Sequence, residues 1–206
     1  MRRNLYGGLL VAAFVTVAAD GLAAQETGTP MFKAPYRAFT THEFGAAFSD
    51  PGSTASFALE GFYSYGRGSN DFGIRAGIED PEGPGSTRLL LGGDFRARIV
   101  SYSESFPLDG ALTVGAGINV GDGDDLIYLP LGVTLGRRFE LEGSKTTFTP
   151  YVHPVIVPVL GATGGSDVGF ALGLGVDLRF SQTWAVRVSG GIGDLEGVGI
   201  ALTYVQ

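Results

Sequence analysis

Residues 167–180, DVGFALGLGVDLRF, restrict the fold of this chain more than any other stretch of its sequence. The even-numbered side chains from Val168 to Phe180 are all apolar, whereas the odd-numbered positions hold aspartate, glycine, alanine and arginine. Successive side chains of a β-strand point to opposite faces of the sheet. The pattern therefore predicts a long strand with one apolar face and one face of charge and glycine.

The same period of two recurs in segments that turn residues separate. We expect strands at residues 42–48, 54–66, 71–79, 87–100, 108–120, 126–139, 146–160, 167–180, 184–192 and 197–205. All of these ranges except 42–48 are as long as a tilted strand that crosses a bilayer, which takes about 9–11 residues. The predicted fold is an all-β, closed antiparallel up-and-down transmembrane β-barrel of about ten strands, with eight as the alternative count.

The N-terminal residues have the composition of a secretory signal. MRRN is basic, LYGGLLVAAFVTVAA is apolar, and small residues allow cleavage after Ala23 or Ala24. An uncleaved anchor is the alternative, but the apolar run is short for a spanning helix and contains a Gly-Gly pair. We expect residues 1–24 to be a removed signal peptide, 25–41 to be a linker or a tucked N-terminal segment, and 42–206 to be the barrel.

Overall composition excludes several functions. The net charge of -7 argues against nucleic acid as a partner, because phosphate binding requires a basic surface. The absence of cysteine excludes thiol chemistry and cysteine-based metal sites. The 34 glycines show no three-residue period, so the chain is not collagen-like.

Alternating strands fit two architectures. In a soluble sandwich or barrel the apolar face packs inward, whereas in an outer-membrane barrel it faces lipid and the polar face lines the lumen. Here the polar face mixes glycine with charges of both signs, which suits a narrow interior where side chains pair. We favour the membrane barrel, and a soluble periplasmic barrel that binds an apolar ligand is the alternative.

This choice of faces assigns individual residues. The expected lumen charge network consists of Glu43, Glu60, Arg75, Glu79, Asp94, Arg96, Arg98, Asp177, Arg179 and Arg187. The expected lipid-facing side chains are Phe72, Ile74, Phe95, Ile99, Phe170, Leu172, Leu174, Val176 and Leu178. Glycines on the polar face leave room for a thin water path, but paired arginines and carboxylates favour a structural interior over a narrow pore.

The signal sequence, the glycine-rich alternating strands and the closing strand GVGIALTYV resemble the small outer-membrane β-barrel family over about residues 42–206. This family includes the opacity proteins and the transmembrane domain of outer-membrane protein A. The resemblance implies a location in the outer membrane of a Gram-negative bacterium, with outer-membrane lipid and the barrel assembly machinery as partners. It also implies an insertion signal in the last strand, at Val198, Ile200, Leu202 and Tyr204.

Residues with catalytic or metal-binding chemistry are few. The two histidines, His42 and His153, have no nucleophile motif near them, so we expect no enzyme. The acidic turn GDGDD at 121–125 lacks the spacing of an EF-hand, and we interpret it as a solvated hairpin turn. We expect no cofactor and no metal.

Prolines complicate the segment 146–160. Pro150, Pro154 and Pro158 all lie at even positions, so their missing N–H groups face the same neighbouring strand. Pro130 lies in the preceding predicted strand. We expect either a gapped ladder on that edge or a stretch that lies partly outside the sheet.

Overall fold

The structure of the protein is a computed structural model, and it describes residues 26–122, 125–161 and 165–206. The predicted signal peptide, residues 1–24, lies outside the described residues. The strands are β1 (His42–Asp50), β2 (Ala55–Arg67), β3 (Asn70–Pro81), β4 (Arg88–Val100), β5 (Asp109–Val120), β6 (Leu126–Tyr128), β7 (Leu131–Gly136), β8 (Phe139–Glu140), β9 (Thr147–Gly161), β10 (Ser166–Arg179), β11 (Trp184–Gly193) and β12 (Gly197–Val205). A single turn of 3-10 helix, η1 (Gly52–Thr54), follows β1.

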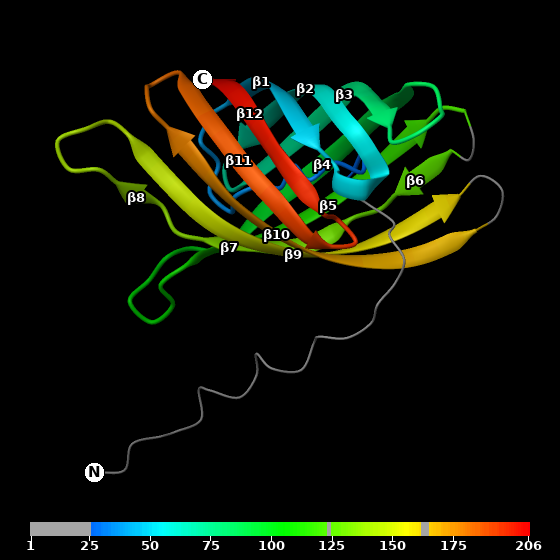
Figure 1. Cartoon of the computed structure of the whole chain (residues 1–206). Coiled ribbons are helices and arrows are strands. Elements are labelled where there is room, and N and C mark those ends of the chain that lie inside the picture. The colour runs from blue at the N-terminus through cyan, green and yellow to red at the C-terminus, as the bar shows by residue number, and fades with distance from the viewer. Residues whose placement is uncertain (1–25, 123–124, 162–164) are drawn as a thin grey trace, which may run out of the picture.

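The strands form one antiparallel sheet that closes on itself, as Figure 1 shows. β1 pairs with β12, with Phe44 opposite Tyr204, and each strand of the wall pairs with its neighbours in the chain. β6, β7 and β8 follow one another along the same edge of β9, so they act as one interrupted wall strand and the barrel has ten. The predicted all-β, up-and-down barrel of about ten strands is confirmed, and the alternative count of eight is wrong.

The interruption of the wall lies beside the prolines of β9. β9 itself is continuous and pairs with β10 without a break in register. On its other edge the carbonyl of Pro158 accepts from Leu129 N–H at 3.0 Å, and that of Pro150 accepts from Arg137 N–H at 3.3 Å. The backbone N–H and C=O positions of the even-numbered residues of β9 therefore point towards β6, β7 and β8. At these positions proline can accept a hydrogen bond but has no N–H to donate. The predicted gapped ladder is confirmed, and the stretch does not leave the sheet.

The two ends of the barrel differ in what they carry. At one end, the terminal rim, the N–H groups of Thr40 and Thr41 both donate to the carbonyl of Gln206, at 2.9 and 2.8 Å. The loop at 101–108 and the hairpin of β8 and β9 extend outward on this side (Figure 1). The other end, the far rim, carries η1 and the β11–β12 turn at 194–196.

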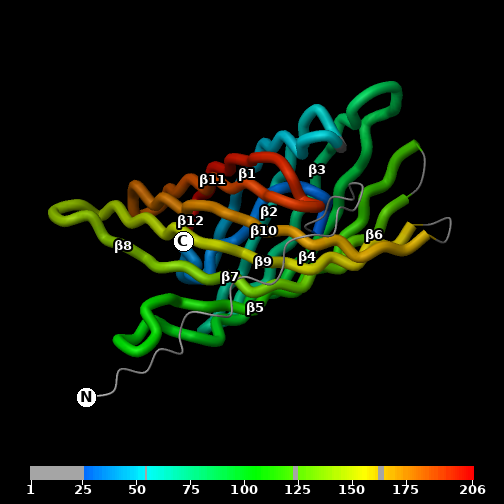
Figure 2. Tube along the Cα trace, turned by 60° about the horizontal axis from the view of Figure 1, so that its bottom comes forward, coloured from blue at the N-terminus to red at the C-terminus, as the bar shows by residue number. Residues whose placement is uncertain are grey.

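Residues 26–41, called the N-terminal segment from here on, form no strand and no helix. From 26 to 35 every residue is buried, and the segment lies within the ring of strands, as its blue trace in Figure 2 shows. Residue 25, the first of the predicted linker, lies outside the described residues. In the described ranges, no helix has the length and apolar character needed to span a membrane.

Candidate functional site: the barrel interior

The outward face of the barrel is apolar. Of the side chains predicted to face lipid, Phe72, Ile74, Ile99, Phe170, Leu174, Val176 and Leu178 are exposed on the outside, and Phe95 and Leu172 are half-buried. In the last strand, Val198, Ile200 and Leu202 are exposed, and Tyr204 is half-buried against Trp184, with ring centroids 5.3 Å apart.

The inward face collects the charged residues. The residues assigned to a lumen network that are buried there are Glu43, Glu60, Arg75, Glu79, Arg96, Asp177 and Arg187, together with the side chain of Asp94. Two residues of the assigned set lie instead at the terminal rim, where Arg179 is half-buried and Arg98 is exposed. The structure thus buries eight of these ten side chains inside the barrel and places two at its rim, and alternation does not show this difference in depth along the barrel axis.

Three arginines of the wall bind carboxylates of the wall. Arg187 Nε donates to Asp177 at 2.9 Å, and its Nη2 lies 3.4 Å from Glu43. Arg96 Nε donates to Asp71 at 2.8 Å. Asp71 was not assigned from the sequence, although it begins the same odd-numbered face of β3 as Arg75, and that alternation was sufficient to find it.

Arg75 joins the wall to the N-terminal segment. It lies 3.7 Å from Glu60 of β2 and 3.7 Å from Glu26 of the segment. The same Glu60 accepts hydrogen bonds from the hydroxyls of Thr27 and Thr29, each at 2.7 Å. Both carboxylate oxygens of this buried residue are therefore held by the segment, which lowers the cost of keeping the charge away from water.

Two further contacts hold the segment at Lys33 and Ala34. Lys33 Nζ lies 2.5 Å from Asp94, with both side chains buried. Arg96 donates to the backbone carbonyl of Ala34, in addition to its bond with Asp71. The sequence did not indicate Lys33 or Glu26 as members of the network, because residues 25–41 have no period that shows a buried side.

Glycines of the inward face lie beneath the segment. At Gly117 a Cβ would overlap the backbone of Glu26, and at Gly173 it would overlap the ring of Phe32. The segment approaches the wall so closely that these positions have no room for a side chain. Part of the glycine content therefore reflects the space that an inserted chain requires.

An apolar cluster also occupies the interior. Phe32 of the segment packs with Tyr151, Val155 and Leu195 in one buried cluster, and the Tyr151 hydroxyl donates to the Phe32 carbonyl at 2.8 Å. The interior is therefore not only charged and glycine-rich, as predicted. In β9 both faces carry apolar residues, so alternation could not reveal that one of them lies inside.

The two histidines have structural surroundings. His153 is buried, its Nε2 lies 2.8 Å from the Thr113 hydroxyl, and its ring packs edge-on against Phe32. His42 lies at the terminal rim, where Nδ1 is 2.9 Å from the Tyr63 hydroxyl. In the described part of the chain, no group of three or more His, Cys, Asp or Glu side chains is arranged to hold a metal ion. Asp124 of the acidic turn lies outside that part.

Two cavities between the N-terminal segment and the wall are small. The cavity beside Lys33, Asp94 and His153 has a volume of about 10 Å³, and so has the one beside Asp177 and Arg179. A cavity of this size holds about one water molecule. At these two places the N-terminal segment and the wall together leave no path wide enough for a solute.

Comparison with family models finds no match, and comparison with curated protein sequences finds none either. Among solved structures, a bacterial polysaccharide outer membrane secretin is similar, with a TM-score of 0.42 and 11% sequence identity. The similarity covers 73% of this chain and 56% of the secretin chain, so this protein spans little more than half the length of that structure.

Proposed function

We propose that the protein is an integral β-barrel of the outer membrane of a Gram-negative bacterium, and that its own N-terminal segment keeps the barrel closed. The observation that carries this proposal is the apolar outer surface. Exposed large apolar side chains occur on neighbouring wall strands, among them Phe48, Leu59, Ile74, Leu91, Val114, Leu131, Ile156, Phe170, Val188 and Ile200. Soluble monomers rarely expose contiguous apolar patches above a few hundred Å², whereas a closed barrel in lipid requires such a surface.

The interior supports the same proposal. A soluble barrel that carries an apolar ligand needs an apolar cavity. Here the interior buries Arg75, Arg96 and Arg187 with their carboxylate partners, and the N-terminal segment fills the space beside them. The protein therefore has its apolar surface where lipid would lie and its ionic groups where lipid would be absent.

A structural barrel is favoured over an open pore. The contacts Lys33–Asp94 and Arg75–Glu26 tie the segment to the neighbouring strands β4 and β3 of the charged interior. Displacing the segment would remove Lys33 from the buried Asp94 and Glu26 from the buried Arg75, which is costly. The segment is therefore expected to stay in place in the resting protein and to keep ion flow below detection.

The remaining assignments follow from this proposal. Outer-membrane lipid surrounds the barrel, and the barrel assembly machinery inserts it by recognising the last strand after the signal peptide is removed. His42 and His153 serve packing and hydrogen bonding, and the protein is not an enzyme. It uses no cofactor and binds no nucleic acid.

Cell fractionation combined with gel mobility tests the location. The protein should sediment with outer membranes, resist extraction by salt, and run faster on a gel before heating than after it. A purified chain that stays dispersed without detergent would contradict the proposal and favour the soluble alternative.

Planar bilayers test the closed state. The full chain should give no channel events, whereas a variant that lacks residues 26–39 should conduct. Heat-modifiable mobility shows whether that variant still forms a barrel, and Lys33→Glu, which repels Asp94 without shortening the chain, provides a second route to displacement. Conductance by the full chain equal to that of the shortened chain would contradict closure by the segment.

A further inference from the structure

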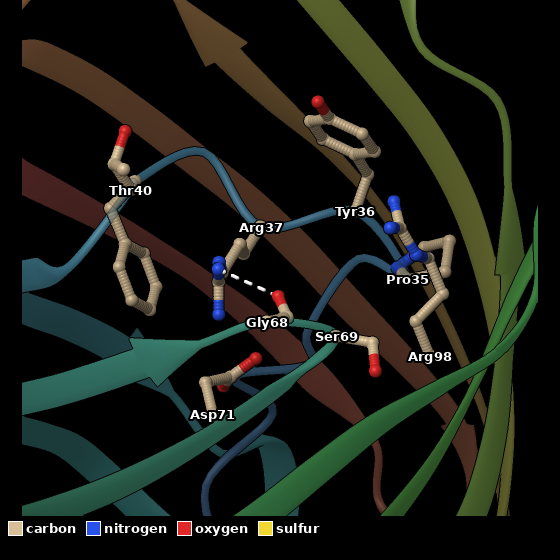
Figure 3. Close-up of a pocket in the computed structure, with 9 residues that line it drawn as sticks. Pro35, Tyr36, Arg37, Thr40, Gly68, Ser69, Asp71 and Arg98 are labelled. Atoms are coloured by element: carbon tan, nitrogen blue, oxygen red, sulfur yellow. Dashed lines mark hydrogen bonds between the residues drawn. The ribbon is translucent and has the colours of Figure 1, made fainter.

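A cavity of about 220 Å³ opens at the terminal rim, between the end of the N-terminal segment and the barrel wall (Figure 3). We call it the mouth pocket. Tyr36 and Arg37 line it from the segment, and Ser69, Asp71 and Arg98 line it from β3, β4 and the turn between β2 and β3. It is far larger than the two single-water cavities described above.

Two arginines give the mouth pocket a positive charge. Neutral carbonyls position the Arg37 guanidinium, which donates to Asn70 O at 2.7 Å and to Gly68 O at 2.8 Å. The Arg98 guanidinium lies 5.9 Å from the centre of the Tyr36 ring, across the pocket from Arg37 in Figure 3. Within the described part of the chain, neither arginine forms a salt bridge. Guanidinium groups that have no carboxylate partner of their own bind carboxylate or phosphate.

The floor of the pocket carries a negative charge, the carboxylate of Asp71. Asp71 Oδ2 accepts from Arg96 Nε at 2.8 Å, and the side chain is only 3% exposed. Its other oxygen, Oδ1, is buried and accepts no hydrogen bond from any described residue. A buried carboxylate oxygen without a donor is costly, so the site calls for a ligand that donates a hydrogen bond as well as one that carries a negative charge.

We propose that the mouth pocket binds a small zwitterion with the chemistry of an α-amino acid. Its carboxylate lies between Arg37 and Arg98, and its ammonium group lies against Asp71, where a small turn of the buried side chain opens Oδ1 to the donor. A simple anion fits less well, because it would bring a second negative charge towards Asp71 and leave Oδ1 without a donor. A simple amine would leave both arginines without an anion.

Calorimetric titration of the full chain in detergent tests the proposal, with glycine, leucine and glutamate as zwitterions, acetate and inorganic phosphate as anions, and methylamine as the amine. At least one amino acid should bind with a dissociation constant of about 1 mM or tighter, and at least about tenfold more tightly than the anions or the amine. The proposal is overturned if no amino acid binds, or if acetate or phosphate binds as tightly as the amino acids do.

Substitutions locate the site. Arg98→Met should weaken amino-acid binding at least about tenfold, and because Arg98 is exposed at the rim the barrel should fold as before. Arg67→Met is the matched control, since Arg67 is an exposed arginine near the same rim that does not line the pocket. Asp71→Asn should weaken amino-acid binding but not acetate binding. Equal loss in the Arg98 and Arg67 variants, or unchanged binding in Asp71→Asn, overturns the proposed geometry.

Discussion

The ring of Phe32, in the N-terminal segment, lies against the backbone of Gly173 in β10, in the space that a side chain at position 173 would occupy. Phe32 is fully buried, and its carbonyl accepts a hydrogen bond from Tyr151 of the neighbouring strand β9. The wall of the barrel and the segment within it therefore have complementary shapes at this point. The glycine serves the inserted segment rather than the strand that contains it.

Substituting Gly173 by valine tests this complementarity. Valine favours strands, so in an empty barrel Gly173→Val would be neutral or stabilising. In this structure it overlaps the Phe32 ring, and we expect a loss of about 1–3 kcal/mol in the free energy of unfolding. Urea unfolding in detergent, followed by the fluorescence of Trp184, the only tryptophan of the chain, measures it.

Gly61→Val is the control for this prediction. Gly61 lies on the outside of β2, where a new Cβ would come no closer than 4.0 Å to its nearest neighbour. The same substitution should therefore cause little loss there. Equal stability of the two variants would contradict an inserted Phe32.

The Lys33–Asp94 ion pair gives a second prediction. Both side chains are buried, so Lys33→Met leaves a carboxylate with less compensation in a place without bulk water. We expect a loss of about 3–5 kcal/mol, as for other broken buried pairs. The double variant Lys33→Met, Asp94→Asn should lose clearly less free energy of unfolding than the sum of the two single losses. Each single substitution leaves one buried charge without its partner, whereas the double variant removes both charges.

The double-mutant cycle also has a result that contradicts the pairing. If the losses of Lys33→Met and Asp94→Asn add within about 0.5 kcal/mol, the two residues do not interact in solution. Lys145→Met, in the exposed turn before β9, serves as the control for loss of a lysine and should leave stability unchanged.

Most of the barrel follows from alternation in the sequence. The pattern at 167–180 predicted a strand that the structure gives as Ser166–Arg179, and the pattern at 184–192 predicted one that it gives as Trp184–Gly193. Such long strands show their period because one face meets an apolar surrounding and the other meets charge. The segment 126–139 was less well predicted, because the breaks beside the prolines of β9 depend on a neighbouring strand.

The contents of the interior followed much less from the sequence. Residues 26–35 have no period, and their burial depends on an environment that the distant strands supply, so no local pattern reveals it. Thr27 and Thr29 look like ordinary linker residues until Glu60 is beside them. Alternation assigns a side chain to one face of a strand, but it does not say what lies opposite that face.

Glu196 provides a prediction about pH. Its carboxylate, in the β11–β12 turn, accepts from the Ser53 hydroxyl at 2.6 Å and from the Ser53 N–H at 3.1 Å. These hydrogen bonds to the charged form hold the pKa of Glu196 below its ordinary value of about 4.3. Because the folded pKa is lower than the unfolded one, the contact stabilises the far rim above about pH 4.3 and is lost as pH falls through the folded pKa.

Carbon-detected NMR of the Glu196 carboxyl measures this pKa directly. Ser53→Ala removes the hydroxyl donor and should move the pKa upward, towards the ordinary value. Ser86→Ala, which removes a hydroxyl that binds Asp122 on the same rim, should leave the titration of Glu196 unchanged. A Glu196 pKa that does not respond to Ser53→Ala would contradict the contact.

A substitution on the outer surface distinguishes a barrel surrounded by lipid from one surrounded by water. Ile74 lies near the middle of β3 and is 64% exposed on the outside of the barrel. If lipid surrounds it, Ile74→Lys places a charge within the bilayer and should cost about 2–4 kcal/mol of folding free energy in lipid vesicles. If water surrounds it, the same substitution removes an exposed apolar side chain and should be neutral or improve solubility.

Glu82→Lys supplies the reference for this comparison, because Glu82 is exposed in the β3–β4 turn at the far rim. A lysine there meets headgroups or water in either environment, so its effect on unfolding should be small. A large loss for Ile74→Lys beside a small one for Glu82→Lys is expected only when the middle of the strand meets hydrocarbon. Equal effects of the two lysines would mean that Ile74 faces water, and the apolar outer surface would then require a protein partner instead of a membrane.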